Sequence, residues 1–242
     1  MTRDPHRDQP VLTAGRKLSE AAGAIILVHG RGASAEDILQ LRDELDYPEL
    51  AYVAPQAAEN TWYPYSFLAP IEQNEPWLTS ALNKLKNIVG NITREGIPQD
   101  KIVIAGFSQG ACLASEFVAR NAANYGGLIA FTGGLIGPPE TDFHYTGSLS
   151  GTPAFLGAGD PDAHVPWQRV RESADVLSAL GADVLLRRYP GMPHTISRQE
   201  LEEARRLLDR TFSPTVKTAA SLVEEARSVV IQLRGSERGP RE

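Results

Sequence analysis

The segment 101–112, KIVIAGFSQGAC, constrains the fold of this chain more than any other stretch of the sequence. A β-branched apolar run leads into Gly-x-Ser-x-Gly, and a pattern of small residues typical of a helix follows. Glycine at positions 106 and 110 allows a turn in which a Cβ would collide with neighbouring backbone. The segment therefore predicts a strand, a sharp turn and a helix, with Ser108 at the tip of the turn.

A serine presented in this way is suited to attack a substrate. The turn pushes its hydroxyl out over the edge of the sheet, and the amide N–H groups that follow point toward the atom under attack. With 21 glycines in the chain, the motif also arises by composition, so a strand-to-helix turn without chemistry is the alternative. The strand before Ser108 and the helix after it favour a nucleophile.

Strands and helices are expected to alternate along most of the chain. Apolar runs predict further strands at 24–28, 50–54, 127–131, 153–157 and 184–189. Helical spacing of apolar residues predicts helices at 35–45, 77–92, 170–180 and 198–208. This order indicates a single domain over residues 21–212, built on a parallel sheet with helices on both faces, preceded by a polar arm at 1–20.

Four unusual loops are expected at one edge of this sheet. They follow predicted strands and begin after Val28, Ala105, Gly157 and Tyr189. Ligands of parallel sheets bind beyond the carboxyl ends of the strands. The convergence of these loops therefore predicts an active site at that edge.

A nucleophilic serine needs a base to accept its proton, and three histidines follow Ser108 in the sequence. His144 precedes the loop that holds the candidate acids, and His164 lies too close to Asp162 along the chain to be an easy partner for it. His194 is favoured because it lies at the exit of the last predicted strand, in the chain order serine, acid, histidine.

The acid that would orient the histidine lies in the segment Gly159-Asp160-Pro161-Asp162. Asp160 and Asp162 both follow a buried strand, and only one is needed. On the residues alone both remain open, and the other aspartate is expected to cap the next helix or to bond within the loop.

Two further loops are candidates for the substrate site. In the glycine-rich loop 29–33, the backbone N–H of Arg31 is positioned to hold an oxyanion, with an ordinary strand-to-helix turn as the alternative. The proline-broken segment 61–71 is rich in aromatic residues and indicates either a binding element or a cover for the core.

The composition excludes several classes of function. A formal charge of −6 without a basic stripe argues against nucleic acid, and the chain shows neither a span for a membrane nor a signal-peptide core. The one cysteine, Cys112, excludes an internal disulfide, is expected in the core, and suits a cytoplasmic location. The spacing of His, Cys, Asp and Glu predicts no metal site.

Together, six segments resemble the phospholipase/carboxylesterase family of small α/β hydrolases. They lie in order between residues 22 and 212, and comprise 29–32 (HGRG), 61–62 (TW), 96–102 (GIPQDKI), 106–110 (GFSQG), 159–166 (GDPDAHVP) and 189–194 (YPGMPH). The resemblance implies an α/β-hydrolase fold, with a mostly parallel central sheet covered by helices on both faces and no large separate cap domain. It also implies that no cofactor is needed.

The resemblance assigns roles to residues. It implies Ser108 as nucleophile, His194 as base and Asp162 as the acid that orients it. It further implies an oxyanion hole formed by the backbone N–H groups of Arg31 and Gln109. Arg31 stands where the thioesterases of the family usually have leucine, which places the chain nearer the bacterial esterase branch.

The expected function is that of a serine carboxylesterase acting on small to medium acyl esters through an acyl-enzyme intermediate. Aromatic side chains are expected to narrow the substrate pocket, namely Trp62, Tyr63, Tyr65 and Phe67. An acyl thioesterase or lysophospholipase is the alternative within hydrolases. A ligand-binding protein that keeps the fold without turnover is the alternative from another class.

The C-terminal segment 213–242 lies outside the resemblance. Val216, Val223 and Val230 recur at seven-residue spacing after Ser213-Pro214, which predicts an amphipathic helix over 214–233 followed by a charged tail. Its apolar seam must be covered. We expect a second copy of the chain to cover it, giving a homodimer, with docking on its own domain as the alternative.

Overall fold

The computed structural model describes residues 4–212, and their centre is a seven-stranded sheet in the order β1-β3-β2-β4-β5-β6-β7. Strand β1 is antiparallel to β3, and the other neighbours are parallel. The strands are β1 Val11–Gly15, β2 Ala24–Val28, β3 Ala51–Pro55, β4 Ile102–Phe107, β5 Gly127–Phe131, β6 Pro153–Asp160 and β7 Asp183–Pro190. The predicted parallel sheet is confirmed.

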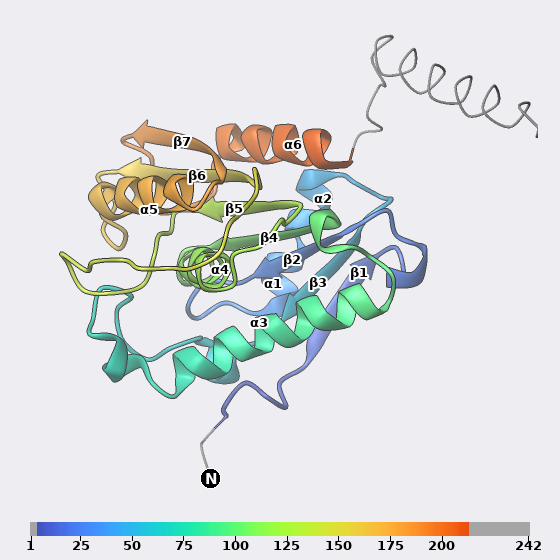
Figure 1. Ribbon diagram of the computed structural model, residues 1–242, viewed down its shortest axis with the longest axis horizontal. Coiled ribbons are helices and arrows are strands. Elements are labelled where there is room, and N and C mark those ends of the chain that lie inside the picture. The colour runs from blue at the N-terminus through green and yellow to red at the C-terminus, as the bar shows by residue number, and fades with distance from the viewer. Residues whose placement is uncertain (1–3, 213–242) are drawn as a thin grey trace, which may run out of the picture. The chain divides into compact units, whose positions relative to one another are not determined.

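Six α-helices of the described residues cover the two faces of the sheet. They are α1 Ala35–Leu39, α2 Leu41–Leu45, α3 Trp77–Arg94, α4 Gln109–Arg120, α5 Trp167–Ala179 and α6 Arg198–Phe212. Alternate residues of β2 point to opposite faces, with Ile26 packed among side chains of α3, α4 and α5, and Ile25 among side chains of α1, α2 and α6. In Figure 1 the central strands β2, β4 and β5 lie between α3, in the lower part of the view, and α6, in the upper part.

The central strands are apolar on every residue because both faces of the sheet are covered. All five residues of β2 and of β5 are buried, as is typical of parallel sheets. No separate cap domain is inserted between strands in residues 4–212, which agrees with the predicted fold class.

One predicted helix is divided in the structure. The sequence predicts a single helix over 35–45, whereas α1 ends at Leu39, and the amide of its C-cap residue Gln40 donates to the Asp37 carbonyl at 3.2 Å. This bond spans three residues and tightens the last turn, so α2 starts afresh. The predicted start is confirmed, because Ser34 and Asp37 form a reciprocal capping box.

The N-terminal arm lies against the domain. His6 is fully buried, and its ring centroid lies 5.4 Å from those of both Trp62 and Trp77. Its backbone N–H donates to Ser80 Oγ at 2.9 Å, and Lys84 Nζ donates to the carbonyl of residue 9 at 2.5 Å. Polarity alone predicts an arm at 1–20, and the structure attaches residues 4–10 of it to α3.

Two sequence predictions concern the ends of the chain and the membrane. The predicted helix 214–233 and charged tail lie outside the described residues. Of the helices between residues 4 and 212, none is long and apolar enough to cross a bilayer.

Candidate active site

Ser108 lies in the sharp turn between β4 and α4. Its backbone adopts φ 55° and ψ −118°, a conformation that side chains other than glycine rarely adopt and that costs roughly 1–3 kcal/mol. A Cβ on Gly106 would lie 2.5 Å from the carbonyl carbon of Gly110, and one on Gly110 would meet the Val28 carbonyl oxygen. The two glycines therefore let α4 approach β2 and β4 closely enough to form the turn.

The structure brings Ser108, His194 and Asp162 into one hydrogen-bonded chain. Ser108 Oγ lies 2.8 Å from His194 Nε2, and His194 Nδ1 lies 2.8 Å from Asp162 Oδ2. The carboxylate holds the imidazole proton on Nδ1, which leaves Nε2 free to accept the proton of the serine hydroxyl. This order suits general-base activation of the hydroxyl.

Asp162 is fixed by its own loop. Its Oδ1 accepts hydrogen bonds from the backbone N–H groups of His164 and Val165, each at 2.8 Å. Burial of Asp162 opposes its ionisation, but these amide bonds and the bond from His194 outweigh it and hold the pKa of the carboxyl below its ordinary value. The residue therefore stays an anion, which suits the candidate role of orienting His194.

The second candidate acid lies apart from the histidine. Asp160 forms an ion pair with Arg188 on the neighbouring strand β7. The two aspartates are thus distinguished by their partners, because Asp162 contacts His194 and Asp160 contacts Arg188.

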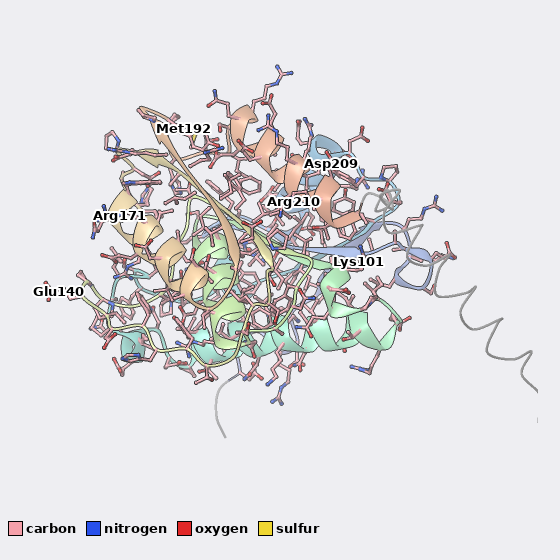
Figure 2. The ribbon with its side chains drawn as sticks, turned by 45° about the horizontal axis from the view of Figure 1, so that its top comes forward. Lys101, Glu140, Arg171, Met192, Asp209 and Arg210 are labelled. Atoms are coloured by element: carbon pink, nitrogen blue, oxygen red, sulfur yellow. The ribbon has the colours of Figure 1, made fainter. Side chains whose placement is uncertain are left out.

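The three residues come from the carboxyl ends of β4, β6 and β7. Figure 2 shows Met192, two residues before His194, on the left of the view together with Glu140 and Arg171. Lys101, directly before β4, lies on the right with Asp209 and Arg210 of α6. The loops that carry Ser108, Asp162 and His194 therefore lie at the sheet edge where the sequence predicts an active site.

Two backbone amides next to Ser108 are candidates for holding an oxyanion. The N–H groups of Arg31 and Gln109 have no hydrogen-bond partner among residues 4–212, and both residues line the cavity around the serine. Gln109 N is the first amide of α4, where the helix dipole favours negative charge.

A cavity of about 480 Å³ opens over Ser108. Three of the four aromatic residues predicted for the pocket line it, namely Tyr63, Tyr65 and Phe67. Other lining groups are Phe107 and His164, whose rings lie 5.0 Å and 4.8 Å from the ring of His194. A cavity of this size suits a small ligand.

Trp62 does not line the cavity, contrary to its predicted role as a substrate contact. Its side chain is fully buried behind the wall, and its indole N–H donates to the His29 carbonyl at 2.9 Å. The reason is that its ring fills the space between His6 and His29, so it belongs to the core.

The side chain of Gln109 is a positioning group that sequence reasoning missed. Its Oε1 accepts from the Trp62 N–H at 3.0 Å, and its Nε2 donates to the Tyr63 carbonyl at 2.8 Å. The residue whose backbone N–H is a candidate oxyanion donor therefore also holds the aromatic segment through its side chain. Because 46 residues separate Gln109 from Tyr63, no local pattern marks the contact.

Buried His29 is a second group that the sequence did not single out. Its Nδ1–H donates to the Gly30 carbonyl at 2.8 Å, and its Nε2 accepts from the Ala57 N–H at 3.1 Å. Burial lowers the pKa of this imidazole, so it stays neutral and fixes the start of the glycine-rich loop.

Cys112 is fully buried, as predicted. Burial raises the pKa of its thiol to about 12, so it is protonated at neutral pH. Among residues 4–212, no three His, Cys, Asp or Glu side chains are grouped to hold a metal ion.

Known proteins resemble this chain along most of its length. The sequence model of the phospholipase/carboxylesterase family matches residues 14–212. The crystal structure of a phospholipase/carboxylesterase from Dyadobacter fermentans is 46% identical, with a TM-score of 0.81 over 83% of this chain and 97% of that one. Acyl-protein thioesterase 1 of Debaryomyces hansenii is 28% identical over 83% of this chain and 96% of its own length. A Bacillus cereus carboxylesterase, 19% identical over 85% of this chain and 96% of that one with a TM-score of 0.67, shares the fold.

Proposed function

The chain belongs to the phospholipase/carboxylesterase family and is a carboxylic ester hydrolase, and from that premise we propose that it is a serine carboxylesterase for small to medium acyl esters. The observation that carries the proposal is the contact of 2.8 Å between Ser108 Oγ and His194 Nε2. A base within this distance of a hydroxyl can remove its proton as the hydroxyl attacks.

The reaction proceeds in two halves. Ser108 Oγ attacks the ester carbonyl while His194 Nε2 takes the proton, and the imidazolium that forms is stabilised by Asp162. The tetrahedral intermediate collapses as His194 returns the proton to the leaving alcohol. A water molecule, deprotonated by the same nitrogen, then releases the acyl group from Ser108.

Negative charge on the carbonyl oxygen is met by the N–H groups of Arg31 and Gln109. Within residues 4–212 neither amide donates to another group, and each well-placed donor contributes about 3 kcal/mol to stabilisation of the transition state. Because these amides are fixed before the substrate binds, no free energy is lost to reorganise them during the reaction.

The size of the acyl group follows from the cavity. Tyr63, Tyr65 and Phe67 form one wall of a space of about 480 Å³, which favours acyl chains of short to medium length. Rates with p-nitrophenyl esters of increasing chain length measure this preference, and a maximum at long chains contradicts it.

A fluorophosphonate probe tests the nucleophile. The probe is expected to label the native protein and to leave Ser108→Ala unlabelled. Ser115→Ala is the matched control, because this buried serine of the same helix donates to the Ala111 carbonyl and lies outside the cavity. Equal labelling of Ser108→Ala and native protein contradicts the proposal.

A thioesterase is the second candidate function, because several relatives are acyl-protein thioesterases, at 24–28% identity. Oxyesters and thioesters with the same acyl chain separate the two, and a strong preference for the thioester would reverse the ranking. Lysophospholipase activity is tested with a lysophospholipid in the same assay. The connected triad argues against a protein that binds ligands without turnover.

Two expectations about the protein's setting stay predictions. These are the cytoplasmic location and the homodimer through residues 214–233.

A further inference from the structure

The side chain of Arg31 has no part in the reaction described above, although its backbone offers an oxyanion donor. Its guanidinium donates three hydrogen bonds to consecutive backbone carbonyls of the aromatic segment. Nη1 donates to Pro64 at 2.9 Å, and Nη2 donates to Tyr63 at 2.9 Å and to Tyr65 at 2.6 Å. The guanidinium carbon also lies 5.9 Å from the centre of the Tyr63 ring. We call these contacts the Arg31 clamp.

The carbonyls in the clamp differ in how much they depend on Arg31. The Tyr63 carbonyl also accepts bonds from the side chains of Thr61 and Gln109. Within residues 4–212, the carbonyls of Pro64 and Tyr65 accept a hydrogen bond from Arg31 and from no other residue. The turn at 64–65 is therefore the part of the wall that the clamp shapes.

Asn74 holds the same turn from its other side. Its Oδ1 accepts from the Tyr65 N–H at 2.9 Å, and its Nδ2 donates to the Ser66 carbonyl at 3.0 Å. These bonds join Asn74 to the wall but not to the glycine-rich loop 29–33, whereas Arg31 is part of that loop. The clamp thus joins the wall to the oxyanion loop, and Asn74 only fixes the wall.

The chemistry of arginine suits this task. A planar guanidinium offers five N–H donors in a fixed fork, and here two of its nitrogens share three carbonyls, whereas a lysine ammonium concentrates its donors on one nitrogen and has no such fork. None of the described residues that line the cavity is Asp or Glu, so no lining carboxylate competes for the guanidinium. A second tie joins the same two loops, because the Gly32 N–H donates to the Asn60 carbonyl at 2.8 Å.

We propose that the side chain of Arg31 is a specificity-determining positioning residue, which holds the wall at 63–65 against the oxyanion loop and so limits the acyl chain. This inference rests on the proposed esterase function. Loss of the clamp frees the turn at 64–65 and enlarges the cavity, while it loosens the loop that carries the oxyanion donor of Arg31.

The first test compares chain-length profiles of Arg31→Met and Arg31→Lys with the native protein. For p-nitrophenyl butyrate we expect kcat/KM to fall about tenfold in both variants, whereas kcat/KM for p-nitrophenyl decanoate changes little. The ratio of the two kcat/KM values, butyrate to decanoate, therefore falls. Lysine is expected not to restore the ratio. A native ratio in both variants overturns the proposal.

Asn74→Ala and Arg42→Gln are the matched comparisons. Asn74→Ala loosens the wall alone, so we expect a changed ratio with kcat for butyrate nearer the native value than in Arg31→Met. Arg42 is exposed and pairs with Asp43 away from the cavity, so its variant keeps the native profile. Equal kcat loss in Asn74→Ala and Arg31→Met contradicts the joining role of the clamp.

Chemical rescue tests whether the planar cation itself matters. Millimolar guanidinium chloride is expected to restore part of the butyrate activity of Arg31→Ala, with sodium chloride at the same ionic strength as control. Ammonium chloride is expected to restore none. Equal recovery with all three salts overturns the role of the guanidinium fork.

Hydrogen exchange of the amides at 65–69 provides a readout without substrate. We expect faster exchange in Arg31→Met and Arg31→Lys and native exchange in Arg42→Gln. Unchanged exchange in both Arg31 variants overturns the clamp. Absence of ester hydrolysis by the native protein would instead contradict the proposed function, so the two failures are distinguishable.

Discussion

The proposed catalytic rim and the cavity wall of this protein are built in different ways. The rim consists of Ser108, Asp162 and His194, and the wall is the segment 63–67, with Trp62 buried behind it. On the rim, the Asp162 carboxylate is held by amides two and three residues further along the chain. In the wall, Tyr63 is held by Arg31 from 32 positions away, and behind the wall Trp62 is held by His6 from 56. The Asp162 carboxylate is thus oriented by its own loop, whereas the wall is held by contacts between distant segments.

The largest expected effect tests the rim. Asp162→Asn is expected to lower kcat by about 10³–10⁴-fold, because an amide stabilises neither the required tautomer of His194 nor the imidazolium. Asp160→Asn is the control, and we expect kcat within about threefold of native, since Asp160 pairs with Arg188. Steady-state kinetics on both variants measure the difference. Similar losses in the two variants would show that the rim is not built as the geometry indicates.

A glycine substitution tests the local construction of the turn. Gly110→Ala is expected to lower the free energy of unfolding by at least about 3 kcal/mol, because the new Cβ meets the Val28 carbonyl oxygen in a packed interior. Gly90→Ala is the contrasting variant. Its Cβ points into open space on helix α3, so we expect about 0.5–1 kcal/mol of stabilisation. Urea unfolding of both variants measures the effect, and an unaffected Gly110→Ala would contradict the close approach of α4 to β2.

The next effect concerns the support of the wall. His6→Ala is expected to lower the free energy of unfolding by about 2 kcal/mol, because it opens a space between Trp62 and Trp77 and leaves the Ala58 N–H without its acceptor. His144→Ala, at an exposed position, serves as control. Because the wall shapes the pocket without reacting, kcat/KM is expected to fall only a few-fold. A loss as large as that of Asp162→Asn would erase the distinction between rim and wall.

The smallest expected effect is a pH dependence of stability. Burial lowers the pKa of His6 below its ordinary value, so the unfolded chain binds its proton first. The contribution of His6 to stability is complete above about pH 6.5 and declines as the pH falls, by at most about 1.4 kcal/mol per pH unit.

The difference in the free energy of unfolding between the native protein and His6→Gln isolates the contribution of His6. We expect urea unfolding at pH 7.5, 6 and 5 to give a smaller decline for His6→Gln. His29 behaves like His6 in both proteins, and Glu200, whose pKa burial raises, acts in the opposite sense in both. Asp162 loses its contribution only at lower pH, because its pKa is depressed. An equal decline in the free energy of unfolding with falling pH in the two proteins would show that His6 does not contribute to the pH dependence.

The same contrast explains what the sequence predicts and what it leaves open. The strands at 24–28 and 127–131 are predicted to the residue, because continuous apolar runs between turn residues identify buried strands. Ser108 and His194 follow from their places at strand ends. The choice between Asp160 and Asp162 needs the direction of two side chains on one loop, which neither spacing nor residue type specifies.

The remaining misses lie in the wall and its supports. Trp62 carries the aromatic signal of a pocket residue, yet its indole is buried because His6 and His29 pack on it. His6 lies in a polar segment that composition assigns to an arm. Both outcomes depend on tertiary contacts that no window of neighbouring residues contains.

Burial of Cys112 makes it possible to label the cavity wall at one chosen position. The chain holds a single sulfhydryl, and its burial and raised pKa disfavour the thiolate that maleimides and iodoacetamides require. Tyr65, with 57% of its surface exposed, is a convenient place to introduce a second one. A fluorophore attached through Tyr65→Cys would then be the single label on the turn at 64–65, and its anisotropy would report how firmly the Arg31 guanidinium holds that turn.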